Sequence, residues 1–201
     1  RQTTRSLSYL ASIDQGTSSS RVILYDAESL APVASHQVEL QSATSTPEPG
    51  WSQMDPAAIL QSVDDAAQGA LDKANASAKD VVGVGITNQR ESTVCWDSQS
   101  GDALYDCILW HDARTRDVSQ ALQERLGGID ALRGVTGLPI STYFSGVKLK
   151  WLLDEVPSVR NALERGSLRF GTVDTWLLNH LTGNHVTDFT NASRTLMMDL
   201  E

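Results

Sequence analysis

The order of hydrophobic patterns in the first ninety residues limits this chain to a mixed α/β fold. Three segments alternate apolar and polar residues, as half-buried strands do, and a helical pattern and a compact apolar run, "VVGVGITNQ", follow them. Strands are predicted at residues 9–13, 21–25 and 30–40 and, for the apolar run, at 81–89. The helix is predicted to begin with Asp55 as its N-cap and Pro56 as its first residue. Because a strand that follows a helix can pair in parallel with an earlier strand, we expect a mixed sheet with flanking helices.

The second half of the chain is predicted to be richer in helices. A hairpin-like pair of strands near residues 93–96 and 103–110 surrounds "DSQSGD". Helical segments are then expected over residues 114–127 and 146–165, and a short strand at 168–170 leads into a helix that ends at Gly183. On the helix near 150, we expect Trp151 to pack and Lys148 and Lys150 to be solvated or structural.

Charge and composition exclude some classes of function. The 201 residues carry a formal net charge of −9, and no cluster of Lys and Arg occurs that could hold a nucleic-acid backbone. No apolar run approaches the roughly 20 residues of a membrane span. The two cysteines, Cys95 and Cys107, indicate core residues of a reducing compartment, so a cytoplasmic location is expected. Residues 1–8, with two Arg and no acid, are predicted to be a flexible tail.

A polar stretch, "DQGTSSSR", separates the first two predicted strands. A turn there can direct the backbone N–H groups of residues 16–19, Gly16 to Ser19, and several hydroxyls at one point, which suits a phosphate. Asp14 at the strand tip is suited to hold Mg²⁺, directly or through water, and Arg21 adds a positive charge. The alternative is a hydroxyl-rich hairpin whose polar groups are solvated.

A second polar cluster, "TNQRE", follows the strand at residues 81–89. Ligands of open α/β sheets bind at the ends of parallel strands, and Arg90 with Glu91 offers donors and an acceptor for a small molecule with several hydroxyls. The alternative is a solvated ion pair. Neither the glycine-rich loop of P-loop enzymes nor a complete dinucleotide fingerprint occurs, since Asn88 stands where the latter needs its third glycine.

Five segments together resemble the FGGY family of carbohydrate kinases in their order and approximate spacing. They are "DQGTSSSR", "PEPGW", "GITNQRESTVCW", "YFSGVKLKWLLDE" and "FGTVDTWLLNHLTG…HVTDFTNASRT", and they cover about residues 9–201. "PEPGW", "TNQRE" and "TNASRT" are most similar to the branch of the family that phosphorylates glycerol. The resemblance implies an actin-like ATPase (ribonuclease H-like) domain that transfers the γ-phosphoryl group of Mg·ATP to a hydroxyl.

The resemblance also implies roles for particular residues. Arg90, Glu91 and Tyr143 match residues that hydrogen-bond glycerol, and Trp110 matches one that lies along its carbon backbone. Residues facing the nucleotide phosphates are matched by Thr17, Ser18, Ser19 and Arg21, and Asp14 matches one near the Mg²⁺. Without the resemblance, the sequence favours another interpretation, in which Trp110 is a core residue and Tyr143 is a loop residue that packs on a neighbour.

One element of the family pattern is absent from these residues. The family's catalytic base is an Asp in a G-D-Q-Q segment, which does not occur here and is expected beyond Glu201, together with a C-terminal domain that carries the adenine pocket. Residues 9–201 are therefore expected to form the substrate-binding N-terminal domain and to be inactive alone.

Three functions remain open at this point: a kinase for glycerol, a kinase for another polyol or sugar, and a non-catalytic actin-like nucleotide-binding module. A homo-oligomer is compatible with each of them.

Overall fold

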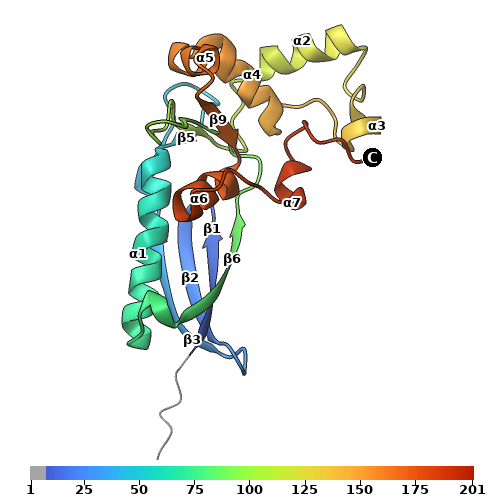
Figure 1. Ribbon diagram of the computed structural model, residues 1–201. Coiled ribbons are helices and arrows are strands. Elements are labelled where there is room, and N and C mark those ends of the chain that lie inside the picture. The colour runs from blue at the N-terminus through green and yellow to red at the C-terminus, as the bar shows by residue number, and fades with distance from the viewer. Residues whose placement is uncertain (1–7) are drawn as a thin grey trace, which may run out of the picture. The chain divides into compact units, whose positions relative to one another are not determined.

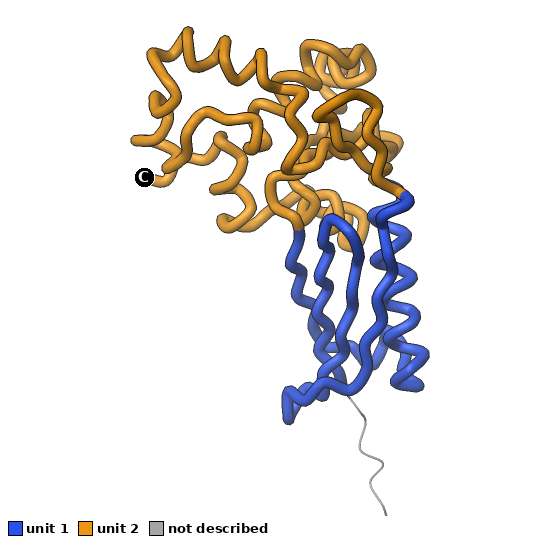
Figure 2. The backbone as a smooth tube through the Cα atoms, turned by 180° about the vertical axis from the view of Figure 1, so that it is seen from behind, with its two compact units in different colours: residues 1–42, 57–88 blue, residues 43–56, 89–201 orange. Residues whose placement is uncertain are grey.

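The computed structural model describes residues 8–201, which form two compact units (Figure 2). Unit 1 comprises residues up to 42 together with 57–88, and unit 2 comprises residues 43–56 and 89–201. The predicted tail lies outside the described residues except for Ser8. Each unit is described below by itself.

Unit 1 contains a four-stranded mixed sheet in the order β3-β2-β1-β6 (Figure 1). Its strands are β1 (Tyr9–Gln15), β2 (Ser19–Asp26), β3 (Pro32–Glu39) and β6 (Val81–Asn88). β1 is antiparallel to β2 and parallel to β6, while β2 is antiparallel to β3. The predicted meander with a parallel fourth strand is confirmed.

Helix α1 (Pro56–Ala74) covers one face of this sheet (Figure 1) and begins at the predicted proline. Ser62 of α1 shares a 2.7 Å hydrogen bond with Ser20 of β2, and Lys73 donates to the carbonyl of Ser35. The helix approaches β3 closely at Gly69, where a Cβ would lie 2.2 Å from the ring of His36. The apolar core between helix and sheet contains Tyr9, Ile13, Val22, Leu24, Ile59, Val63, Ala66 and Ala70. A short 3₁₀ turn, Ala78–Asp80, leads into β6.

Unit 2 combines two small sheets with six helices in its described residues. One sheet has the order β4-β5-β8, and the other pairs β7 with β9. The strands are β4 (Thr44–Ser45), β5 (Gln53–Met54), β7 (Val94–Asp97), β8 (Cys107–Ile108) and β9 (Leu168–Gly171). The helices are α2 (Arg116–Leu126), α3 (Arg133–Thr136), α4 (Ser145–Glu155), α5 (Pro157–Glu164), α6 (Val173–Thr182) and α7 (Phe189–Ala192). A 3₁₀ turn, Gln41–Ala43, precedes β4.

The predicted hairpin exists only as part of a larger arrangement. Two antiparallel bridges, Thr93 with Ile108 and Trp96 with Ala103, join its two segments as expected. The longer pairings lie elsewhere, because β7 pairs with β9 and β8 pairs with β5. These partners lie far away in the chain, so no local pattern indicated them.

Two hydrophobic clusters hold unit 2 together. The first gathers β7, β8, α4 and α5 around Cys95, Ile108, Leu152, Val156 and Val159. The second contains Leu138, Ile140, Phe144, Val147 and Leu196. Both cysteines are free and buried, which confirms them as core residues, and burial raises the pKa of each thiol to about 12. Among residues 8–201, no helix has the length and apolar character needed to cross a bilayer.

Candidate functional site

The turn between β1 and β2 in unit 1 carries the predicted phosphate-facing residues. Its backbone is tight: the N–H of Gly16 donates to the carbonyl of Ser19 at 2.9 Å, and a Cβ at residue 16 would lie 3.3 Å from that oxygen. The amide of Gly16 is thus engaged within the turn. Ser18 is exposed, Thr17 and Ser19 are half-buried, and Leu40 donates to the carbonyl of Ser18 at 2.7 Å. The turn is therefore held from two sides.

Asp14 and Arg21 face each other in the ladder of β1 and β2. Both are exposed, on the sheet face opposite the buried side chains of Ile13 and Gln15, because successive residues of a strand alternate between faces. The Asp14 carboxylate has no hydrogen bond or ion pair with another described residue. Arg21 donates through Nε to Gln37 of β3 at 2.8 Å, which holds its guanidinium along the sheet.

Arg90 and Glu91 lie in unit 2 shortly after the end of β6, and their side chains have different environments. Arg90 is exposed, whereas the Glu91 side chain is only 6% exposed. Glu91 does not pair with its neighbour: its Oε1 accepts a 2.6 Å hydrogen bond from Nε of Arg194, far away in the chain. The hypothesis of a solvated Arg90–Glu91 pair is therefore wrong for this structure.

The backbone around Glu91 is held by two hydroxyls. Its carbonyl accepts from Ser145 Oγ at 3.1 Å and from Thr93 Oγ1 at 3.2 Å. Ser145 is the first residue of α4, so this helix fixes the position of the carboxylate-bearing segment. A buried carboxylate on a fixed backbone presents its free oxygen in one direction.

Trp110 and Tyr143 form an aromatic pair close to Glu91. Their ring centroids are 5.6 Å apart, and the guanidinium carbon of Arg194 lies 5.9 Å from the centroid of the Tyr143 ring. Contacts thus run continuously from Glu91 through Arg194 to Tyr143 and Trp110. The structure brings three of the four predicted polyol-binding residues together; for Arg90 it records no side-chain contact with them.

Lys148 supports the Tyr143 segment from inside the protein. Its side chain is completely buried and donates to the carbonyls of Thr142 and Tyr143 at 2.8 and 2.6 Å. Burial lowers its pKa to about 7, and the negative charges of Asp112 and Glu91 oppose that shift. Of the two roles expected for Lys148, solvated or structural, the structural one is therefore confirmed. Lys150 is instead a half-exposed partner of Asp154, and Trp151 packs against Trp51 with ring centroids 5.4 Å apart, as predicted.

Sequence reasoning assigned no role to Arg194, although "TNASRT" was singled out as a segment. A signal did exist there, since that segment carries the one arginine between Arg169 and Glu201. Pairing with Glu91 depends on folding, because 103 positions separate the two residues.

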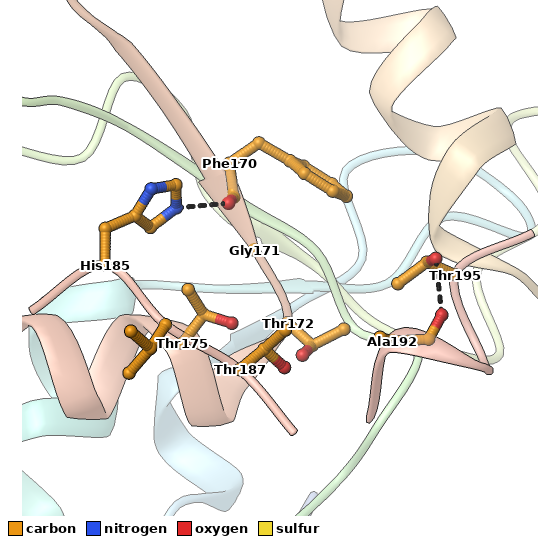
Figure 3. Close-up of a pocket in the computed structure, with 9 residues that line it drawn as sticks. Phe170, Gly171, Thr172, Thr175, His185, Thr187, Ala192 and Thr195 are labelled. Carbon is orange, nitrogen blue, oxygen red and sulfur yellow. Dashed lines mark hydrogen bonds between the residues drawn. The ribbon is translucent and has the colours of Figure 1, made fainter. Parts of the chain in front are cut away.

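A small hollow of about 230 Å³ lies elsewhere in unit 2, between the end of β9, the start of α6 and the segment around α7 (Figure 3). His185 shares a 2.9 Å hydrogen bond with the carbonyl of Phe170 at its edge. None of the predicted site residues lines this hollow, and the hydroxyl of Thr172, which does line it, donates to Asp174. It contributes no group to the predicted site.

The described residues do not form a metal-binding site from protein ligands alone, since no group of three or more His, Cys, Asp or Glu side chains that could hold an ion occurs among them. A metal at Asp14 would therefore take most of its ligands from water or from a bound substrate.

Comparison with known proteins places this geometry in context. Residues 9–201 match the N-terminal domain of the FGGY family of carbohydrate kinases. A glycerol kinase from Brucella anthropi is 48% identical over 198 residues, which is 96% of this chain and 39% of that protein. The crystal structure of Plasmodium falciparum glycerol kinase with ADP superimposes with a TM-score of 0.86 at 33% identity, over 96% of this chain and 38% of that one.

A xyloylose kinase from Brucella ovis has a TM-score of 0.81 at 26% identity, over 95% of this chain and 38% of that one. This chain therefore spans about two fifths of the length of these relatives.

Proposed function

Because this chain belongs to the FGGY family of carbohydrate kinases, we propose that the protein containing it phosphorylates glycerol with ATP, giving glycerol 3-phosphate and ADP. The observation that carries the proposal is the contact chain from buried Glu91 through Arg194 to Tyr143 and Trp110. A small polyol needs each hydroxyl satisfied and its C–H side covered, and this arrangement offers a carboxylate acceptor beside an aromatic wall.

In the proposed site, each residue has a distinct part in binding. The free oxygen of Glu91 accepts a glycerol hydroxyl, and Arg90 donates to another from its exposed position. Trp110 covers the carbon backbone, while Tyr143 contributes a ring with a polar tip. A base positioned on the attacking hydroxyl is expected from an Asp outside these residues.

The β1–β2 turn is proposed to face the phosphates of ATP through Gly16, Thr17, Ser18, Ser19 and Arg21. The tight backbone of the turn supports this role, since a preformed turn loses little conformational entropy on binding. Asp14 fits Mg²⁺, because its carboxylate is exposed and bonds to no other residue within 8–201. Mg²⁺ is commonly bound by one or two carboxylates together with water and substrate phosphates. Bound there, the ion would neutralise charge on the transferring phosphoryl group.

The two free, buried cysteines support a cytoplasmic location, which we keep as part of the proposal.

The test is acceptor selectivity of the full-length protein. ADP release is measured with Mg·ATP and glycerol, D-xylulose or gluconate, and the product is identified by ³¹P NMR. We expect kcat/KM for glycerol to exceed that for the other acceptors at least tenfold. Preference for a pentulose would instead assign the protein to another branch of the family, and nucleotide binding without acceptor-dependent ADP release would indicate a non-catalytic module.

A further inference from the structure

We propose that Arg194 is a positioning residue that orients the Glu91 carboxylate for its substrate hydroxyl. The inference rests on the proposed function, since it names a residue that prepares the polyol pocket. It concerns a residue that does not itself need to touch the substrate.

The first support is how the two side chains meet. Arg194 uses Nε, rather than a terminal nitrogen, to donate to Oε1 of Glu91 at 2.6 Å. No other described side chain bonds to this carboxylate, so Oε2 keeps its full capacity to accept. One oxygen is thereby fixed by the arginine and the other is left for a ligand.

The second support is what holds Arg194 in place. Its guanidinium carbon lies 5.1 Å from the Phe144 ring centroid and 5.9 Å from that of Tyr143, within the range of cation–π attraction. Only 29% of its side chain is exposed. A planar guanidinium can stack on rings while donating in its own plane, which an ammonium group cannot do.

The third support is the first turn of α4, which fastens both backbone segments. Ser145 Oγ donates to the carbonyl of Glu91, and the N–H of Gly146 donates to the carbonyl of Thr195 at 2.6 Å. A Cβ at residue 146 would lie 2.9 Å from that Thr195 oxygen, so glycine is what permits the approach. One helix turn thus sets the distance between the segments that carry Glu91 and Arg194.

Charge provides the reason for the arrangement. A carboxylate that is nearly buried needs a compensating charge or hydrogen bonds to stay ionised and oriented. Lys148 also lies near Glu91, but it donates its hydrogen bonds to the carbonyls of Thr142 and Tyr143, whereas Arg194 bonds directly to the carboxylate. Arg194 is therefore the group that sets the direction of the carboxylate.

The experiment compares variants of the full-length protein in steady-state kinetics. Arg194→Met places a methyl group at the position of Nε and removes the donor together with the rest of the guanidinium. We expect it to raise the KM for glycerol more than tenfold, while kcat at saturating glycerol and the KM for ATP change less than threefold. Arg194→Lys keeps the charge without Nε and should raise the glycerol KM to a smaller extent, more than threefold. A general loss of folding would instead lower the apparent kcat and leave both KM values of the remaining folded enzyme unchanged.

A double-mutant cycle separates positioning from independent binding. Adding Arg194→Met to Glu91→Gln should change the glycerol KM less than twofold beyond Glu91→Gln alone, because the arginine acts through the carboxylate. Arg165→Met is the matched control: Arg165 pairs with Asp97 at 3.1 Å in the same unit, and its loss should leave the glycerol KM unchanged.

Three results would overturn the proposal. They are a glycerol KM of Arg194→Met within twofold of the parent, a double variant whose rise in glycerol KM equals the product of the two single rises, and a glycerol KM of Arg194→Lys equal to that of the parent. Should Arg194→Met fail to fold, the Lys variant decides by the same criteria. If the unmodified protein prefers another acceptor, the proposed function fails, and the cycle run with that acceptor still decides the role of Arg194. A protein that phosphorylates no acceptor overturns both.

Discussion

At the scale of single residues, Arg90 and Glu91 are neighbours in the chain whose side chains have different environments. Glu91 is buried and held by Arg194, while Arg90 is exposed and has no partner among the described side chains. An exposed arginine on a backbone fixed next to a buried carboxylate can donate to a ligand without being needed for folding.

Arg90→Ala should therefore raise the KM for glycerol and lower kcat/KM more than tenfold in the full-length enzyme, since a substrate hydroxyl loses a charged donor at about 1.5–3 kcal/mol. The melting temperature should stay within about 2 °C of the parent, because no described contact is lost. Kinetics with an unaltered glycerol KM would remove Arg90 from the pocket.

Lys148 is a residue whose burial costs stability in a pH-dependent way. Its pKa is lowered from 10.5 to about 7 by burial, so between these values the unfolded state binds more protons than the folded state. The contribution of Lys148 to the free energy of unfolding therefore rises as pH increases from about 7 towards 10.5, by up to about 1.4 kcal/mol per pH unit.

We expect the unfolding free energy of the parent, relative to that of Lys148→Met, to increase between pH 7 and pH 9. Urea denaturation of both proteins at several pH values measures it. A constant difference across that range would mean that Lys148 stays charged in the folded protein.

At the scale of elements, a buried ion pair joins β5 to the turn after β8. Arg114 and Asp112 have no exposed side-chain surface, and Arg114 also donates to Gln53 of β5 at 2.8 Å. Its guanidinium carbon lies 4.0 Å from the centroid of the Trp51 ring. One arginine thus joins the segment that carries Trp51 and Gln53 to the turn that follows Trp110, a residue of the proposed site.

Removing one partner of this pair should be costly, because the other is left buried and charged. Asp112→Ala is expected to destabilise the protein by about 3–5 kcal/mol. The matched control is Asp130→Ala, which breaks the pair with Arg133 where both side chains are more than half exposed and should cost less than about 1 kcal/mol. Equal losses in thermal or denaturant unfolding would contradict this interpretation.

At the scale of the molecule, the two kinds of predicted site residue belong to different units. The phosphate-facing turn is in unit 1, and Glu91, Trp110, Tyr143 and Arg194 are in unit 2. Rate in phosphoryl transfer comes from aligning hydroxyl, base and γ-phosphate, so neither set of residues suffices for turnover by itself.

Residues 1–201 expressed alone should therefore show no glycerol-dependent ADP formation, whereas the full-length protein should show it. The isolated chain should also tend to associate, since Val82 and Val84 of β6 are 64% and 57% exposed. A coupled ADP assay and light scattering measure the two effects. Glycerol-dependent ADP release by the isolated chain would mean that an acid within these residues is the base.

Local patterns in the sequence by themselves determined the elements of unit 1 and several boundaries in unit 2. Alternation predicted β1, β2 and β3, Pro56 marked the start of α1, and Gly183, with φ of 74°, ended α6 because a residue in the left-handed region favours glycine. The polar cluster after the predicted strand at residues 81–89 also indicated Arg90 and Glu91 as candidate binding residues. Such features depend on a few consecutive residues, whose preferences are similar in any fold.

Tertiary structure alone decided which distant segments meet. The pairing of Val94 with Gly171, the anchoring of Arg114 on Trp51 and the bond from Arg194 to Glu91 join parts of the chain that no short window contains. The choice among such partners depends on which arrangement buries the most apolar surface while satisfying every buried polar group, and that is a property of the whole packed unit. For this reason the sequence could predict Glu91 as a binding residue, but its bond with Arg194 could be found only in the folded protein.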